Sequence, residues 1–183
     1  MMSGTRMRCG GSVDVTEETP RSGECEECAF DWTTPAPEAI ELVEGSPARV
    51  ADLFSGGAAS RTAGAADPGR WSPAAYLWHL VDVIRFGTER LWTLALDPGA
   101  GFPGWDQDEM AAARRYEGLS TAVGMLALEV AVADWAVAAR EAPPEAIVRL
   151  PVLGEMTTGD AVRRNAHEAV HHELDIRRGL GLA

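Results

Sequence analysis

Residues 71–91 read "WSPAAYLWHLVDVIRFGTERL", and this stretch decides the fold. Ser72 is a residue type favoured at a helix N-cap, and Pro73 suits the first helical position, where its missing N–H is not needed. Apolar side chains then continue until Pro98 and Gly99 end the pattern. The stretch therefore predicts a long helix over residues 72–96.

Three more long helices are expected on either side of it, over residues 36–55, 119–141 and 159–178. The first begins after two prolines and stops at a pair of glycines, with Pro47 expected to break or kink it. The second has apolar residues that follow one helical face: Leu119, Val123, Leu126, Val130, Ala133 and Val137. The third has Thr157 or Thr158 as its cap and closes at Gly179.

The remaining segments are short or irregular. A short helix is expected near residues 107–115, and an extended segment, interpreted as a small hairpin around Gly154, precedes the last helix. Residues 1–33 show no periodicity and form an irregular N-terminal arm. The prediction is an all-α fold, a four-helix bundle over residues 34–183, and metal sites in such bundles are built from side chains that project inward from facing helices.

Composition and net charge limit the classes of partner and the cellular compartment that are expected. The chain of 183 residues suits one domain, and its 16 basic and 28 acidic residues give a net charge of −12. That charge argues against a nucleic-acid partner and against an anionic membrane surface. We see no signal peptide and no apolar run of roughly 18 residues, so a cytoplasmic protein with reduced cysteines is expected. Every basic residue is Arg, which is typical of a GC-rich, actinobacterial source.

Three of the four histidines lie on the last predicted helix, in "NAHEAVHHELDIRRG" (165–179). His167 and His171 lie about 40° apart around a helix and border the core, whereas His172 lies about 140° from His167 and is expected to face solvent. A buried pair of imidazoles without a partner is costly, and a metal ion removes that cost. The fourth, His79, faces inward from the 72–96 helix and can supply a third ligand.

His167 to His171 also satisfies the H-E-x-x-H pattern of zinc proteases. A metzincin continues with a Gly and a third His, but Leu174 and Arg177 occupy those positions here. Other zincins place a third ligand well downstream, where this chain has too few residues. The match is therefore interpreted as accidental.

"WSPAAYLWHLVDVIRFGTERL" followed by "HEAVHHELDIRRG" resembles the DinB-like superfamily over about residues 34–180, and "FPGWDQDEMA" (102–111) is similar to a loop of actinobacterial members. The resemblance implies a four-helix bundle with a metal held by His79, His167 and His171. It also implies an enzyme that uses a low-molecular-weight thiol, mycothiol in actinobacteria, for S-transfer or isomerisation, and by analogy a homodimer.

Three imidazoles leave a zinc ion with an open position, at which a thiol or a water is deprotonated. Nickel or iron also suits such ligands. The sequence leaves three functions open: a thiol-dependent transferase or isomerase acting on a small electrophile, a metal-dependent hydrolase, and a bundle that binds a metal or small ligand without catalysis.

Other residues are weaker candidates. Glu168, Asp175 and Arg164 are candidates for catalysis, although Glu168 is expected on solvated helix surface; Trp105, Arg114 and Arg115 are candidates for binding a cosubstrate. Asp82 and Asp175 either orient an imidazole or pair with Arg85 and Arg178. Cys25 and Cys28 form a C-x-x-C motif, which is typical of a zinc knuckle together with Cys9 or of a redox pair. A knuckle lacks its fourth ligand, since no His is nearby, and the βαβ pattern of a thioredoxin motif is missing, so an incidental or structural role is expected.

Overall fold

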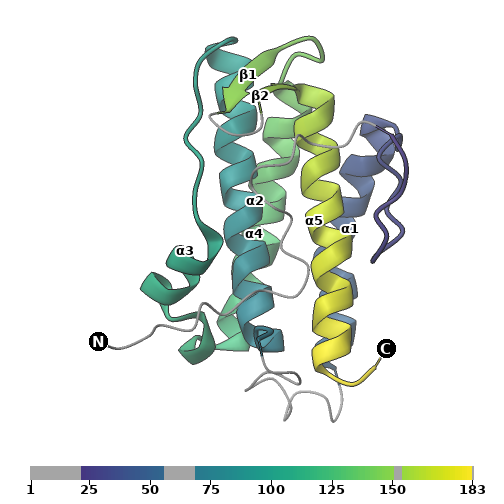
Figure 1. Cartoon of the computed structure of the whole chain (residues 1–183), viewed down its shortest axis with the longest axis vertical. Helices are drawn as coiled ribbons and strands as arrows, with labels where there is room; N and C mark the ends of the chain where they lie inside the picture. The colour runs from purple at the N-terminus through teal and green to yellow at the C-terminus, as the bar shows by residue number, and fades with distance from the viewer. Residues whose placement is uncertain (1–21, 56–68, 151–153, 183) are drawn as a thin grey trace.

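Four long helices form the predicted bundle in the computed structural model, which describes residues 22–55, 69–150 and 154–182 (Figure 1). They are α1 (Ala36–Phe54), α2 (Pro73–Leu96), α4 (Thr121–Glu141) and α5 (Thr158–Gly179). The main contacts run α2 to α4, α4 to α1, α1 to α5 and α5 back to α2. Helix α5 therefore lies between α1 and α2, with core on both sides.

Local capping chemistry explains where these helices begin. The Ser72 hydroxyl accepts a hydrogen bond from the Ala75 amide at 3.1 Å, as the sequence predicts. Thr157 and Asp160 form a reciprocal capping box at the start of α5. These two caps fix the starting points of the two helices that carry the histidines.

Pro47 neither breaks nor ends α1, which continues through it. A proline inside a helix leaves the carbonyl four residues earlier without its N–H donor. Here that carbonyl belongs to Val43, and the Ser46 hydroxyl donates to it at 2.7 Å. The neighbouring serine thus replaces the hydrogen bond that Pro47 cannot make.

Two small units flank the bundle. Strands β1 (Ile147–Leu150) and β2 (Gly154–Thr157) pair antiparallel, with Val148 opposite Met156, and confirm the expected extended segment before the last helix. Helix α3 (Gln107–Arg114) and the 3₁₀ helix η2 (Tyr116–Gly118) lie beside α2 (Figure 1). Arg114 of α3 and Tyr116 of η2 contact Asp82 of α2, which lies one turn after His79.

The prediction of which face of α4 packs on the core is wrong. Val123, Leu126, Val130 and Val137 are exposed, whereas the buried side carries Leu128, Val132 and Trp135, among others. The helix is apolar nearly all round, so its periodicity does not select one face. By length and composition α4 could also cross a membrane, a test that core helices of soluble proteins pass as well.

The described part of the N-terminal arm packs on the bundle. Glu24 and Asp31 form an antiparallel bridge, the Cys25 amide donates to the Phe30 carbonyl at 2.9 Å, and the side chains of Phe30 and Trp32 are buried in the core. Cys9 lies outside the described residues. Residues 22–34 are called the N-terminal segment below.

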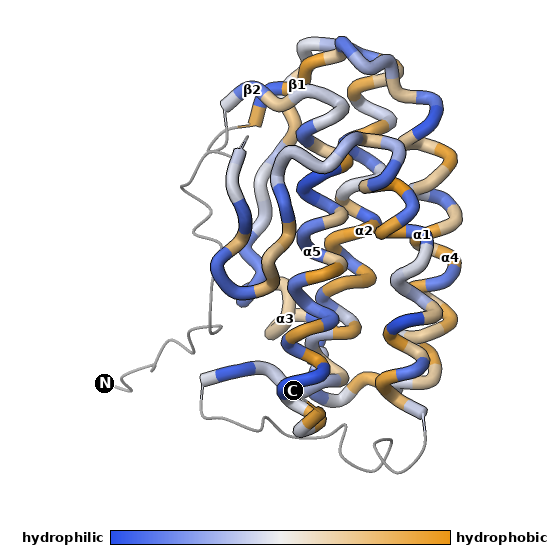
Figure 2. Tube along the Cα trace, turned by 90° about the vertical axis from the view of Figure 1, so that its right-hand side faces the viewer, coloured by the Kyte–Doolittle hydropathy of each residue, from blue (hydrophilic) through white to orange (hydrophobic). Residues whose placement is uncertain are grey.

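Figure 2 shows that hydrophilic residues run along α5 while α2 and α4 are mainly hydrophobic. Many of the polar side chains of α5 are nevertheless buried, because the helix is covered from two sides: Asn165, His167, Glu168, His171, His172 and Asp175. Buried polar groups need partners, so this stripe is where a functional site is expected.

Candidate metal centre

His79 is the most isolated polar group of the core. Its side chain comes from the middle of α2 and is 1% exposed, and neither ring nitrogen has a hydrogen-bond partner among the described residues. Burial, and then the nearby charge of His172, lowers the pKa of His79 to about 3, so its imidazole is neutral. A neutral buried imidazole without partners is in the state that a metal ligand requires.

His79 faces a carboxylate and a second imidazole from α5. The ligand atoms of His79, Glu168 and His172 all lie within 4.8 Å of one another. The His79 and His172 rings meet edge to face at 4.7 Å, and His172 Nε2 lies 3.0 Å from Glu168 Oε2. Two imidazoles and one glutamate are a ligand set of catalytic zinc sites, so these residues fit a divalent ion. They are called the bundle site below.

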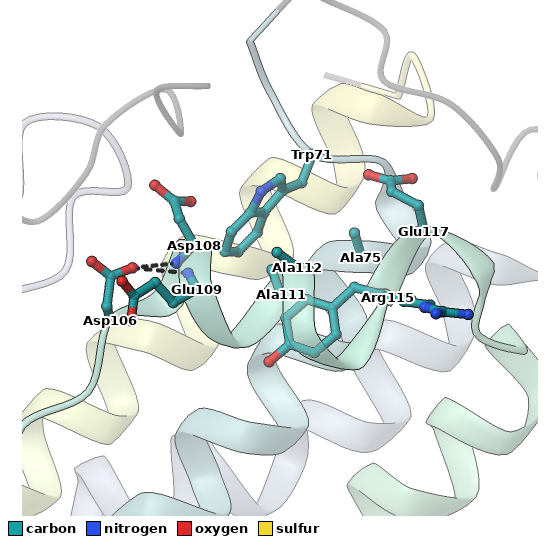
Figure 3. Close-up of a pocket in the computed structure, with 10 residues that line it drawn as sticks. Trp71, Ala75, Asp106, Asp108, Glu109, Ala111, Ala112, Arg115 and Glu117 are labelled. Atoms are coloured by element: carbon teal, nitrogen blue, oxygen red, sulfur yellow. Dashed lines mark hydrogen bonds between the residues drawn. The ribbon is translucent and has the colours of Figure 1, made fainter. Parts of the chain in front are cut away.

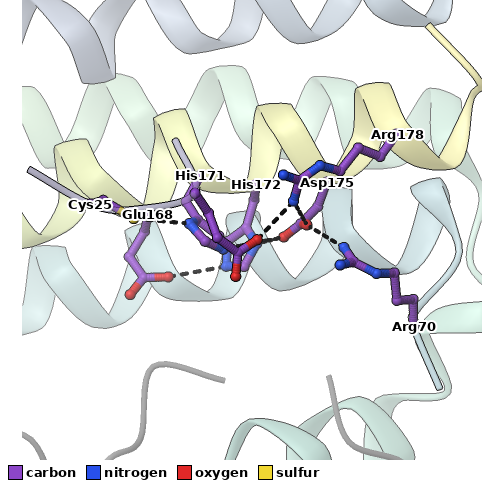
Figure 4. A network of polar contacts seen from close by, with 8 residues as sticks. Cys25, Arg70, Glu168, His171, His172, Asp175 and Arg178 are labelled. Atoms are coloured by element: carbon purple, nitrogen blue, oxygen red, sulfur yellow. Dashed lines mark hydrogen bonds and ion pairs between the residues drawn. The ribbon is translucent and has the colours of Figure 1, made fainter. Parts of the chain in front are cut away.

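His172 is held from behind by Asp175, whose carboxylate lies 3.1 Å from His172 Nδ1 (Figure 4). Arg70 in turn donates to Asp175 at 3.1 Å. Burial alone would lower the pKa of His172, but its hydrogen bonds to Asp175 and Glu168 raise it to about 9. Burial would likewise raise the pKa of Glu168, but the His172 imidazolium holds it well below its usual range. The proton on His172 Nε2 thus lies between His172 and Glu168, and a metal ion held by these two side chains would replace it.

His167 and His171 belong to a different group. Their ligand atoms lie within 4.8 Å of those of Cys25 and Cys28 from the N-terminal segment. Burial lowers the pKa of His167 to about 4 and lowers the pKa of His171 as well. The three histidines predicted as one ligand set are therefore divided between two groups among the described residues, His79 in one and His167 with His171 in the other.

Two expectations from the sequence are wrong. His172 does not face solvent but is 9% exposed, and Glu168 is not solvated surface but 8% exposed. Both errors arise because α5 is buried over more than half of its circumference. The sequence contains a sign of the second ligand pair. Glu168 and His172 are spaced i, i+4, as His167 and His171 are, so either pair could have been predicted as metal ligands.

Aromatic rings enclose His79. Trp105, predicted as a pocket wall, stacks on the His79 ring at 5.6 Å and on Phe86 at 4.7 Å. Trp71 meets His79 edge to face at 5.0 Å. These rings limit the access of water to the imidazole and leave the side toward Glu168 and His172 for a ligand.

The arginines predicted near the site have different roles. Arg114 pairs with Asp82, which also accepts a hydrogen bond from Tyr116 at 2.5 Å, so Asp82 orients these groups and not an imidazole. Arg164 lies 4.0 Å from Glu168, and burial followed by the charge of Arg164 lowers the pKa of the buried Arg90 to about 10. Positive charge therefore gathers on the Glu168 side of the bundle site.

A cavity of about 580 Å³ opens beside α2 (Figure 3). Trp71, which contacts His79, and Ala75, one turn before it, form part of its wall. The rest of the lining comes from α3, η2 and the residues beside them. It combines four carboxylates and one cationic side chain with two alanines and a tyrosine: Asp106, Asp108, Glu109, Glu117, Arg115, Ala111, Ala112 and Tyr116. The size suits a small organic molecule.

A family model for the DinB superfamily matches residues 43–176 of this chain. The chain belongs to the DinB superfamily. Among solved structures, its fold is similar to that of YfiT from Bacillus subtilis, described as a probable metal-dependent hydrolase with an unusual four-helix bundle topology. The TM-score is 0.71 at 15% identity, covering 93% of this chain and 100% of YfiT, which shows a shared fold. No curated protein matches the sequence.

Replacing Asp175 by Asn should weaken metal binding at the bundle site by about 10- to 100-fold, the usual cost of losing a carboxylate behind a ligating histidine. A neutral side-chain amide at this position accepts a weaker hydrogen bond from the N–H of His172 than a carboxylate does. Zinc affinity, measured by competition with a chromophoric chelator in a Cys25→Ser/Cys28→Ser background, checks this. Asp134→Asn, on the exposed side of α4, is the matched control, and equal affinity in both variants would refute the role of Asp175.

Proposed function

We propose that this DinB superfamily protein is a metal-dependent enzyme that holds one divalent ion at His79, Glu168 and His172. We further propose that it transfers or uses a low-molecular-weight thiol, mycothiol in an actinobacterial source, on a small electrophile. The observation that carries the proposal is the buried His79 imidazole, with both nitrogens unpartnered among the described residues and facing the Glu168–His172 pair.

When bound at three protein ligands, a zinc ion lowers the pKa of a thiol or water that takes its open position. The protein residues set the conditions for this. Asp175 fixes the orientation of His172 through Nδ1, and Trp71 and Trp105 cover His79. A dry site with fixed ligands keeps the nucleophile deprotonated and directed at its electrophile.

The cavity beside Trp71 supports a thiol cosubstrate. Its volume of about 580 Å³ is far more than one water needs. Carboxylates accept hydrogen bonds, so a lining with Asp106, Asp108, Glu109 and Glu117 suits a molecule rich in hydroxyl groups, such as the sugar and inositol units of mycothiol. The same charges disfavour an anionic molecule there, whereas the Arg164 and Arg90 side of the site suits an electrophile that carries a carboxylate.

A hydrolase is the second candidate. The similarity to the fold of YfiT, a probable metal-dependent hydrolase, favours it. Such an enzyme needs no thiol, because a water bound to the ion would serve as the nucleophile. The positive charge near Glu168 would stabilise an anionic transition state.

One assay distinguishes the two. The zinc-loaded protein is mixed with a panel of electrophiles and activated esters, with mycothiol, with cysteine, or without thiol. We expect turnover that requires mycothiol and disappears in His79→Ala, with Asp134→Asn unaffected. Turnover that is independent of thiol assigns the hydrolase instead. Stoichiometric metal without turnover on any substrate contradicts both enzymatic proposals.

A further inference from the structure

The C-x-x-C motif of the N-terminal segment faces the bundle histidines that the bundle site does not use. We propose that Cys25, Cys28, His167 and His171 form a second metal site, a structural zinc site that fastens the N-terminal segment to α5. The four ligand atoms lie within 4.8 Å of one another, and Cys25 Sγ lies 3.8 Å from His171 Nδ1 (Figure 4). Tetrahedral zinc with two sulfur and two nitrogen ligands has edges of roughly 3.3–3.8 Å, so little movement is needed.

The backbone around the cysteines directs both sulfurs to the same side. The chain turns back on itself, with the Ala29 amide donating to the Cys25 carbonyl at 2.8 Å and Ala29 at φ 56°, a left-handed conformation. Burial raises the pKa of the Cys28 thiol to about 12 even though the Phe30 amide opposes this, so binding of a metal must displace the proton of this thiol.

The histidine side of the site is equally prepared. His167 and His171 are 2% and 4% exposed. His167 Nε2 has no hydrogen-bond partner among the described residues, and His171 Nδ1 faces the Cys25 sulfur. His171 Nε2 lies 3.7 Å from Asp175, so an ion on His171 Nδ1 leaves the other nitrogen directed at a carboxylate. Asp175 would then orient one ligand in each of the two sites.

The chemistry of the donors points to zinc and to a structural role. Two cysteines and two histidines are a closed tetrahedral set, and thiolates select zinc over magnesium or calcium. The two thiolates balance the charge of the ion. A third grouping, Glu27 with His171 and Asp175, shares His171, but its carboxylates already pair with Arg178 at 2.8 Å and with Arg70 at 3.1 Å.

The site would join a segment that lies before the family match to a helix that lies almost wholly within it. The DinB superfamily match begins at residue 43, so both cysteines precede it, whereas both histidines lie within it. The N-terminal segment has little core of its own: Phe30 and Trp32 pack on His167, with ring centroids 5.7 and 4.6 Å away. An ion that crosslinks this short segment to α5 would hold these rings in place.

Cobalt titration of the full, reduced, metal-free chain tests the site, because cobalt bound by thiolates gives an intense charge-transfer absorption. We expect this absorption to saturate by two equivalents in the unmutated protein, because the bundle site takes one of the two ions. It should be absent in Cys25→Ser/Cys28→Ser and in His167→Gln/His171→Gln. His79→Ala, which damages only the bundle site, and Cys9→Ser should retain it. Zinc per chain, measured by elemental analysis, should fall by one ion in the double cysteine variant.

Zinc should also slow alkylation of Cys25 and Cys28 in the unmutated chain by at least tenfold and leave Cys9 unchanged, a measurement that does not depend on the folding of a variant. Four results would overturn the proposal. Three are the absence of thiolate absorption in the reduced protein, its loss in Cys9→Ser, and alkylation rates that are equal with and without zinc. The fourth is loss of the absorption in His79→Ala, which would show that the histidines serve one shared site. None of these outcomes depends on whether the bundle site is catalytic.

Discussion

Glu168→Gln should abolish metal binding at the bundle site and its activity, whereas His167→Gln should leave both within a factor of about three. Glu168 is the only anionic ligand of the bundle site, is 8% exposed, and lies 3.0 Å from the His172 nitrogen that would share the ion. The neutral amide of the glutamine variant cannot balance a buried divalent charge. Loss of a supporting carboxylate alone costs about 10- to 100-fold in affinity, so loss of this ligand should exceed about 100-fold.

This pair of variants separates two ligand sets. The sequence predicts His79, His167 and His171, while the structure groups His79 with Glu168 and His172. Both variants are made in the Cys25→Ser/Cys28→Ser background, so that only the bundle site is measured, and zinc affinity is followed with thiol-dependent turnover. If His167→Gln removes the ion and Glu168→Gln does not, the set predicted from sequence holds and our assignment is wrong.

The helices could be predicted because their signals are local. Ser72 and Pro73 start α2 within one turn, and Thr157 with Asp160 starts α5, so neither depends on the rest of the fold. The inward position of His79 follows from the apolar residues around it on the same helix. Sequence was therefore sufficient for the bundle and for one residue of the candidate site.

The composition of the site could not be read from local pattern. His171 and His172 differ by about 100° around α5, and the choice between them depends on how the helix is rotated between α1 and α2. Cys25 and His171 lie 146 residues apart in sequence, so no spacing rule connects them. The wrong prediction of the buried face of α4 has the same cause, because the neighbours of an apolar helix, and not its own sequence pattern, decide which face is buried.

Gly87→Ala should destabilise the protein by about 2–4 kcal/mol, although alanine is the better helix former by about 1 kcal/mol. An added Cβ at Gly87 would lie 2.6 Å from Asn165 Nδ2 and 2.7 Å from Asn165 Cγ. Asn165 is buried, accepts a hydrogen bond from Trp135 Nε1 at 3.1 Å and donates to the Val83 carbonyl at 3.3 Å. Moving it leaves buried polar groups without partners and overpacks the contact between α2 and α5.

Urea unfolding of the metal-free protein measures this effect, with Gly104→Ala as control because nothing lies within 4 Å of a Cβ there. An unchanged or higher midpoint for Gly87→Ala would contradict the contact. Asn165 also stands three residues before Glu168 on α5, and Gly87 lies two turns after His79 on α2. The close approach at Gly87 therefore sets the distance between the two helices that supply the ligands, and Gly87→Ala should weaken zinc binding at the bundle site even where the protein remains folded.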